Sequence, residues 1–370
     1  MDKRIPVNLP LIGNEEIEAV AKVLKSGILT GRVQSGPFVK KLENGFAEFV
    51  KARHAFAVNS GTAALHLALL AADVGVGDEV VVPSFSFIAT AEVVALVGAK
   101  PVFVDIEPLT YNIDPEKIEK AITKKTKAII PVDLYGLPAD MKPIREIADK
   151  HGLVIVEDAA QAHGAVYSGK PAGSFADISC WSFYASKNMT TGEGGMMTTN
   201  REEYADRLPF MRAHGEKEEY FSSMIGHNYR MPEVMGAIGY VQLQKLPKFL
   251  QARRKNAARL TEKLGKVEGL LLPSEPKGYR HSWYLYTVRL KDASESVRDK
   301  MVEKLRKKGI GATVYYRTPI HLMPYYRRFG EFRLPETEKA AKQVFSLPVH
   351  PAVTAEQIDY IAETVVNLLR

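Results

Sequence analysis

Short apolar runs alternate with helical patterns along the first half of the chain. The runs are rich in Val, Ile and Ala and predict strands, while the segments between them carry apolar residues at helical spacing. The expected strands are 55–60, 78–83, 101–106, 127–133 and 153–157, and the expected helices are 62–73, 88–98, one that begins at Asp114, and 141–151. Because these strands are continuously apolar and do not alternate, they indicate a mostly parallel sheet covered by helices on both faces.

The second half of the chain has a different order of elements. Strands are expected at 178–184 and 195–199, separated by a Gly-rich turn, and helices at 201–212 and 232–245. From about residue 251 the pattern predicts a long basic helix, a strand at 282–290, a helix at 296–308, a strand at 312–316, and helices at 339–345 and 354–369. The expected fold class is therefore α/β, with a large domain over residues 1–250 and a smaller α+β domain over residues 251–370.

Two of the expected helices begin with capping side chains. Asp114 precedes Pro115 and is placed to act as an N-cap, and Thr354 with Gln357 forms a capping-box pattern. Such side chains satisfy the free N–H groups of a first helical turn, so both helices are expected to begin at these residues.

Composition narrows the class of protein. With 370 residues, 46% of them hydrophobic and 25% charged, the chain resembles an average globular protein with a sizeable core. The net charge is +7, but the basic residues are spread over predicted helix surfaces, so no nucleic-acid partner is expected. The positive balance would suit a substrate that carries phosphates. The single cysteine, Cys180, excludes an intrachain disulfide and a Cys-rich metal site.

The sequence gives no sign of membrane insertion or secretion. No apolar segment reaches the length of a membrane span, and the first residues contain no apolar secretory core. With only one cysteine, the chain is expected to be cytoplasmic and to have no membrane partner.

Polar residues that can bind a ligand follow several of the predicted parallel strands. In such a sheet, ligands bind beyond the carboxyl ends of the strands. Gly61 and Thr62 lie between a strand and a helix, where glycine allows close backbone approach and the helix N–H groups favour an anion. Alone, this segment does not outweigh an ordinary helix N-cap, and it lacks the Gly-Lys-Ser/Thr ending of a Walker A loop.

A carboxylate and an amide follow the strand at 153–157. Asp158 would be partly desolvated there and would need a cationic partner, for which a protonated pyridine nitrogen is suited. Gln161 is placed to donate a hydrogen bond to a ring oxygen. Glu157 is expected to point to the other face of the sheet, and His163 to be a structural hydrogen-bonding residue.

A lysine follows the strand at 178–184. Most lysines are solvated, but Lys187 stands between an apolar strand and a run of small and glycine residues, which would lower its pKa by desolvation and neighbouring charge. A neutral amine is what Schiff-base formation requires. Ser182 is placed to bind a phosphate. Phe85 or Phe87 could stack on a planar ring, although their spacing alone favours core positions.

Taken together, these segments resemble the DegT/DnrJ/EryC1/StrS family of sugar aminotransferases, which depend on pyridoxal 5′-phosphate (PLP) and share the aspartate aminotransferase fold (fold type I). The resemblance extends over nearly the whole chain, and the combination of motifs in this order is what makes it specific. The matching motifs are Asn59-Ser60-Gly61-Thr62-Ala63-Ala64-Leu65, Glu157-Asp158-Ala159-Ala160-Gln161, Ser186-Lys187-Asn188, Thr191-Gly192-Glu193-Gly194-Gly195 and Gly226-His227-Asn228-Tyr229-Arg230-Met231.

The resemblance implies PLP as the cofactor and a role for each matching residue. Lys187 is expected to hold PLP as a Schiff base, Asp158 to pair with the pyridine nitrogen, and Gln161 to contact the ring hydroxyl. Phe87 matches the ring-stacking aromatic better than Phe85. The residues expected to contact the phosphate are Gly61, Thr62 and Ser182 of the same chain and Asn228 of the other subunit.

The resemblance also implies partners and a reaction. The role of Asn228 implies a homodimer with active sites at the interface, and Tyr315, Tyr316 and His321 are candidate substrate contacts. The expected reaction moves an amino group from an amino acid, L-glutamate by family analogy, to a keto-sugar attached to a nucleoside diphosphate, by way of an internal aldimine with Lys187.

Two alternatives to this reaction stay open. The first is a PLP aminotransferase that acts on a cyclitol or an amino-acid-type ketone. The second is a non-catalytic regulatory protein with the same fold, against which the intact set of Lys187, Asp158 and Gln161 speaks. A nicotinamide-dinucleotide enzyme is disfavoured because no Gly-x-Gly-x-x-Gly turn follows the first strand.

Overall fold

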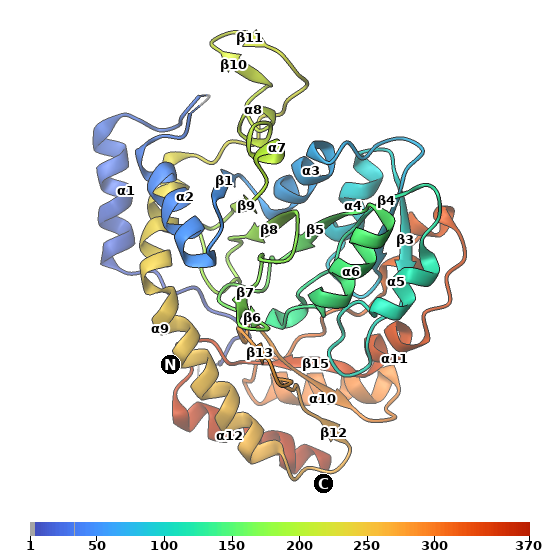
Figure 1. Ribbon diagram of the computed structural model, residues 1–370. Coiled ribbons are helices and arrows are strands. Elements are labelled where there is room, and N and C mark those ends of the chain that lie inside the picture. Colours follow the sequence, from blue (N-terminus) through green and yellow to red (C-terminus); the bar gives the residue numbers. More distant parts are fainter. Residues whose placement is uncertain (1–3, 33) are drawn as a thin grey trace.

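A seven-stranded sheet forms the centre of the molecule in the computed structural model, which describes residues 4–32 and 34–370 (Figure 1). Its strands are β1 (His54–Val58), β2 (Glu79–Pro83), β3 (Lys100–Val104), β4 (Thr126–Ile129), β5 (Val154–Asp158), β8 (Ile178–Ser182) and β9 (Gly195–Thr199). They lie in the order β1-β9-β8-β5-β4-β2-β3. Only β9 runs antiparallel to its neighbours. The predicted mostly parallel sheet is thus confirmed.

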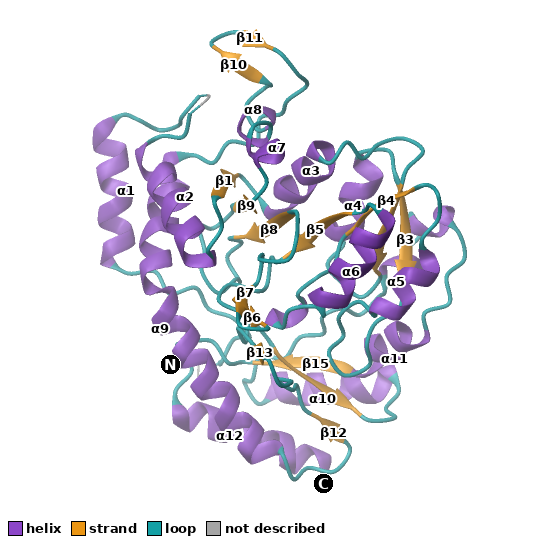
Figure 2. Ribbon diagram, in the orientation of Figure 1, coloured by secondary structure: helices purple, strands orange, loops and turns teal. Residues whose placement is uncertain are grey.

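Helices cover both faces of this sheet (Figure 2). Those of the large part are α2 (Pro37–Val50), α3 (Gly61–Ala71), α4 (Ala89–Leu96), α5 (Pro115–Ala121) and α6 (Met141–His151). Helix α1 (Asn14–Ser26) packs on α9 (Glu233–Leu264) instead. Successive strand residues face opposite sides. Val80 and Val82 pack with α3 and α4, whereas Val81 packs with α5 and α6. Burial on both faces explains why the strands read as continuous apolar runs.

A single helix, α9 (Glu233–Leu264), replaces the two helices expected on either side of residues 246–250, so that prediction is wrong. The helix continues through Pro247, although proline removes one backbone hydrogen bond. Pro247 is exposed, and the buried Leu246 and Leu250 hold the helix against the core beside it, so packing outweighs the lost bond. The expected domain boundary at residue 250 lies inside this helix, and the division remains a proposal.

The C-terminal part builds a second, smaller sheet. Its strands β12 (Leu270–Leu271), β14 (Tyr286–Leu290) and β15 (Val344–Leu347) lie in that order. Helices α10 (Glu295–Lys307) and α12 (Ala355–Leu369) share one apolar cluster with these strands. Ile5, from the opposite end of the chain, also belongs to this cluster and accepts a hydrogen bond from Gly311 N–H at 2.7 Å.

Two predictions for this part of the chain are wrong. Residues 312–316 form no strand, because only Thr313 pairs with β15, through an isolated bridge to Ser346, before the backbone turns along a cavity. The helix expected at 339–345 ends earlier, as α11 (Pro335–Gln343), and Val344 already begins β15. The residues of β15 are all buried, and its β-branched and aromatic side chains suit a sheet better than a helix.

Smaller elements connect these two parts. The helix expected at 201–212 is divided into α7 (Glu202–Ala205) and α8 (Leu208–Met211). A hairpin of β10 (Glu216–Glu218) and β11 (Phe221–Ser222) projects from the molecule at the top of Figure 1. A small sheet of β6 (Val166–Tyr167), β7 (Lys170–Pro171) and β13 (Tyr279–Arg280) lies near the centre, and single 3-10 turns occupy Leu134–Gly136, Ile320–Leu322 and Tyr326–Phe329.

Both predicted capping sites are confirmed. Asp114 Oδ1 accepts the N–H of Glu116 at 2.9 Å. Thr354 Oγ1 accepts the N–H of Gln357 at 3.3 Å, and Gln357 Oε1 accepts the N–H of Thr354 at 3.0 Å, which completes the capping box. In the part of the chain that the structure describes, no helix has both the length and the apolar character needed to cross a membrane.

His163 is fully buried in an aromatic cluster. Its ring centroid lies 6.3 Å from that of Phe46, 5.5 Å from that of Trp181 and 5.8 Å from that of Phe183. Neither ring nitrogen meets the distance and angle limits of a hydrogen bond with a described residue. A backbone contact with Ser182 nevertheless opposes the lowering of the ring's pKa by burial, so the structural hydrogen-bonding role stays a prediction. Burial, followed by the positive charge of Lys187, lowers the pKa of His163 to about 3.

This lowered pKa of His163 predicts a loss of stability in acid. Between about pH 6.5 and 3 the unfolded chain binds a proton that the folded imidazole does not, so the free energy of unfolding falls as the pH falls. We expect His163→Phe, which keeps an aromatic ring, to lose about 2 kcal/mol less unfolding free energy than the wild type between pH 7 and pH 5. Urea titrations at both pH values measure this difference, and equal losses in the two proteins would contradict it.

Candidate active site

A cavity of about 1100 Å³ lies at the carboxyl ends of the parallel strands. Nine of the residues singled out in the sequence line it, although they come from five separate segments of the chain. They are Gly61, Thr62, Phe87, Asp158, Gln161, Ser182, Lys187, Tyr315 and Tyr316. Of the eleven residues expected at the site from the resemblance, the remaining two, Asn228 and His321, do not line it.

Asp158 ends strand β5 and presents a carboxylate to this cavity. It is only 6% exposed, and burial raises its pKa. Thr90 donates its hydroxyl to Asp158 Oδ2 at 2.8 Å, and the N–H of Ala160 approaches Oδ1 at 3.3 Å. Both bonds, with the positive charge of Lys187, oppose the effect of burial. The carboxylate is therefore held in one orientation and is suited to a cation placed in the cavity.

Lys187 follows strand β8, the neighbour of β5, so its amine reaches the same cavity from the adjacent strand. Burial lowers the pKa of this amine to about 8, and the charge of Asp158 only partly opposes the shift. The Nζ atom lies 4.7 Å from the centre of the Tyr284 ring. Near pH 8 about half of such an amine is neutral, which allows it both to attack a carbonyl and to carry a proton.

The Gln161 side chain joins the cavity wall to the segment that carries Tyr135. Its Oε1 accepts the N–H of Tyr135 at 2.7 Å, and its Nε2 lies 3.3 Å from the hydroxyl of Tyr316. The Tyr135 hydroxyl in turn donates to the carbonyl of Tyr315. Gln161 is therefore fixed beside Asp158, with one amide proton left for a ligand.

One end of the cavity is built for an anion. Helix α3 begins at Gly61, and its first N–H groups and the Thr62 side chain border the cavity. Ser182 borders it from β8. A Cβ atom on Gly61 would lie 2.9 Å from Ser182 Cβ, so only glycine allows the helix start and the strand end to approach this closely.

The structure distinguishes between the two phenylalanines that were candidates for stacking on a planar ring. Phe85 is completely buried in the core, whereas Phe87 is 56% exposed and lines the cavity. An exposed aromatic ring at a cavity wall is available to stack on a planar ligand.

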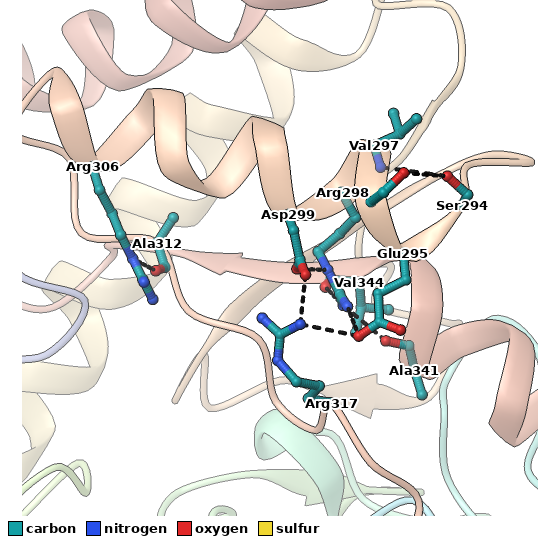
Figure 3. Close-up of polar contacts among 11 residues, drawn as sticks. Ser294, Glu295, Val297, Arg298, Asp299, Arg306, Ala312, Arg317, Ala341 and Val344 are labelled. Carbon is teal, nitrogen blue, oxygen red and sulfur yellow. Dashed lines mark hydrogen bonds and ion pairs between the residues drawn. The ribbon is translucent and has the colours of Figure 1, made fainter.

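A polar network holds the segment that carries Tyr315 and Tyr316 (Figure 3). Arg317, the next residue, donates to Glu295 at 3.0 Å and to Asp299 at 2.6 Å. Arg298 is fully buried, contacts Asp299 at 2.7 Å and donates to the carbonyls of Ala341 and Val344. The network therefore joins α10, α11 and β15 to the cavity wall.

His321 and Asn228 lie outside the cavity. His321 is buried, with Nδ1 2.6 Å from the Ser84 hydroxyl and Nε2 3.5 Å from Glu338. Asn228 is exposed next to the projecting hairpin, and its carbonyl is 3.4 Å from the amide of Asn59. Within one chain, neither residue is placed to contact a ligand in the cavity.

The sequence analysis missed Thr90, which supports Asp158, and several residues that line the cavity. A threonine in a first helical turn is ordinarily structural, and nothing local indicates the bond from Thr90 to Asp158. Tyr184 lies between Ser182 and Lys187, but an aromatic residue after a strand is ordinarily part of the core. The others lie far along the chain from every motif, so no local signal indicated them. They are Arg4, Asn8, Tyr284 and Arg306.

These residues fit PLP. The buried carboxylate of Asp158 forms no ion pair within the part of the chain that the structure describes, which leaves it for a pyridinium nitrogen. The amine of Lys187, the ring of Phe87 and the anion site at Gly61 suit the aldehyde, the ring face and the phosphate of the same molecule. The fold and this cavity define a fold type I PLP-dependent aminotransferase.

The comparison with known families agrees with that class. The chain belongs to the DegT/DnrJ/EryC1/StrS aminotransferase family, whose model matches residues 10–366. The resemblance inferred from the sequence motifs is thereby confirmed.

Several known proteins are similar along their full length. A pleiotropic regulatory protein of Geobacillus stearothermophilus is 42% identical over 98% of this chain and 99% of its own. GDP-perosamine synthase of Caulobacter vibrioides is 38% identical over 97% of this chain and 96% of its own. The solved PLP form of the Streptococcus pneumoniae sugar aminotransferase Spr1654 is 32% identical, covers 99% of this chain and 98% of its own, and superposes with a TM-score of 0.94.

Proposed function

We propose that this protein transfers an amino group from L-glutamate to a keto-sugar linked to a nucleoside diphosphate, with PLP bound to Lys187. The observation that carries the proposal is the convergence of Lys187 and Asp158, from adjacent strands, on one cavity. GDP-perosamine synthase, a relative of the same length, supports the sugar nucleotide as acceptor.

Lys187 is the proton carrier of the proposed reaction. Bound PLP supplies an electron sink for the negative charge that develops at the substrate carbon. Lys187 Nζ, whose pKa is about 8, takes the proton from that carbon and returns it at a neighbouring position. Asp158 keeps its negative charge toward the ring nitrogen because Thr90 and the Ala160 N–H stabilise it.

The outer part of the cavity supports a substrate larger than the amino acid alone. The volume of about 1100 Å³ lies slightly above the usual range for small-molecule sites. Beyond the residues assigned to PLP, its wall includes the cations Arg4 and Arg306 and the rings of Tyr184 and Tyr315. Cations suit a diphosphate, and aromatic rings suit a sugar or a base.

The proposed function is tested by product analysis. Purified protein with PLP, L-glutamate and a panel of ketones should release 2-oxoglutarate and an amino-sugar in equal amounts. We expect turnover of nucleotide-linked keto-sugars to be at least about tenfold more efficient than that of the free keto-sugar, because binding of the remote nucleotide contributes to catalysis. Turnover of a cyclitol ketone alone would favour the first alternative, and release of no 2-oxoglutarate with any ketone would favour a regulatory protein.

We propose further that the active form is a homodimer in which Asn228 contacts the partner's cofactor. Asn228 is exposed and outside the cavity of its own chain. The hairpin region before it exposes large apolar side chains, with Tyr220 83%, Phe221 63% and Ile225 86% exposed. An exposed apolar group of this size suits an interface with a second copy.

Shared sites predict complementation between two inactive variants. Lys187→Ala and Asn228→Ala each inactivate both sites of their own homodimer. In a mixed dimer, one site receives an intact Lys187 and an intact Asn228, so equal mixing with subunit exchange should restore about a quarter of the wild-type activity. Steady-state rates of the mixture measure this. If a tag on one variant demonstrates mixed dimers but the mixture shows only the sum of the two residual rates, the active sites are not shared between subunits.

A further inference from the structure

A second cavity of about 450 Å³ lies away from the active site and is lined by residues of α2, α9 and the β6–β7 hairpin. None of its lining residues lines the active-site cavity. Its volume is within the range of small-molecule sites. Nothing in the proposed reaction uses it.

The inner wall of this cavity is apolar. Val50, Ala165, Ala172, Trp181 and Leu250 line it, and each is buried. The Trp181 ring is held in place by its Nε1–H, which donates to Thr198 at 3.0 Å. A wall of this kind suits an aliphatic or aromatic body and offers it no polar partner.

The rim of the cavity is polar and positively charged. Gln251 and Arg254 of α9 form one side, and Arg280 of β13 forms another. Among the described residues, the cations of α9 that form ion pairs are Lys245, Arg259 and Lys263, not Arg254.

Arg254 carries an unsatisfied donor at this rim. Its Nε is shielded from solvent and has no hydrogen-bond partner within residues 4–32 and 34–370. Burial and repulsion from Arg280 lower the pKa of Arg254, while Glu275 only partly opposes them. The Glu275 carboxylate forms no ion pair with Arg254 among the described residues, and its Oε2 accepts the His281 N–H at 2.7 Å. Two arginines that repel each other at the mouth of an apolar cavity are complementary to one anion.

We propose that this cavity is a binding site for a small organic carboxylate, with its apolar body against Trp181 and its carboxylate between Arg254 and Arg280. The apolar wall selects for the apolar body of such a molecule, and the paired cations select for its carboxylate. A free inorganic anion would leave the wall uncovered, and an uncharged apolar molecule would leave the arginines unpaired.

The test is a titration of the holoenzyme with octanoate, with 1-octanol and inorganic phosphate as the matched probes. The chain contains two tryptophans, and the second, Trp283, does not line the cavity. In a Trp283→Phe background, the emission of Trp181 therefore reports occupation of the cavity. We expect octanoate to change this emission with saturation and to bind at least roughly tenfold more tightly than either other probe, because it alone satisfies both the wall and the arginines.

Charge variants separate this site from non-specific binding. We expect Arg254→Gln and Arg280→Gln each to weaken octanoate binding roughly tenfold, because each removes a charge-assisted contact. Lys255→Gln is the matched control: it lies next to Arg254, removes the same charge, is exposed and does not line the cavity. The affinity of the Lys255→Gln variant for octanoate should stay within about twofold of that of the wild type.

Three results would overturn the proposal. The first is equal binding of octanoate and 1-octanol, which would make the cavity merely apolar. The second is an equal weakening of octanoate binding by Arg254→Gln and Lys255→Gln, which would mean that the net charge of the protein, and not a contact at the rim, determines the affinity. The third is octanoate binding, measured by calorimetry, without any change in Trp181 emission, which would place the ligand elsewhere.

Discussion

Lys187→Ala is expected to reduce transamination by at least roughly 10²- to 10⁴-fold, the range for removal of a positioned proton carrier. The variant loses both the amine that would bind PLP covalently and the group that moves the proton. The alanine fits without a clash because the lysine borders an open cavity. The measurement is the rate of 2-oxoglutarate release with L-glutamate and the acceptor. Covalent attachment is reported by the near-ultraviolet absorbance of the reduced cofactor that stays with the protein after sodium borohydride treatment and denaturation.

Two controls sharpen the Lys187 experiment. Lys170→Ala removes an exposed lysine of β7 and should leave both readouts at the wild-type level. Added methylamine should restore part of the Lys187→Ala rate, since a free amine enters the cavity and replaces the missing proton carrier. A Lys187→Ala protein that still retains cofactor covalently would assign the attachment to another residue and reject the site.

Asp158→Asn is expected to lower the transamination rate by about 10²- to 10³-fold. The asparagine keeps the shape of the side chain, and its amide can still bond to Thr90 and Ala160. It removes the buried negative charge, and loss of one partner of a buried ion pair costs about 3–5 kcal/mol. The electron sink is then weakened although the cofactor is still bound.

The role of Asp158 is tested by measuring cofactor binding and the rate of proton removal separately in Asp158→Asn. We expect covalent attachment at Lys187 to persist while the rate of proton removal, measured with L-glutamate deuterated at Cα, falls. Thr90→Val provides an intermediate case, because it keeps the carboxylate and removes one hydrogen bond, so its rate should fall less. A wild-type rate for Asp158→Asn would show that this carboxylate does not serve the ring nitrogen.

Most of the central sheet could be predicted because its strands are buried on both faces. Burial forces continuous apolar runs such as the three valines at 80–82 of β2, and the polar residue that follows a run is then conspicuous. Asp158 and Lys187 stood out for this reason, and adjacent parallel strands bring both to one cavity. Local pattern and tertiary arrangement agree in this part of the chain.

The errors arise where distant contacts decide the structure. Helix α9 passes Pro247 because Leu246 and Leu250 are held by the core, which no local propensity reports. Strand β15 depends on pairing with β14, nearly 60 residues earlier in the chain. The placement of His321 outside the cavity depends on Ser84, 237 residues away. Residues such as these are brought together only by the folded chain.

The pairing of Ile5 with Gly309 and Gly311 has a consequence for biosynthesis. Ile5 leaves the ribosome some 300 residues before its partners Gly309 and Gly311. During synthesis of the large sheet, the apolar residues beside Ile5 therefore have no native surface to cover them. The smaller sheet is completed only when β15 has been synthesised. A recombinant fragment that begins at residue 251 would therefore lack the segment around Ile5, which completes its core.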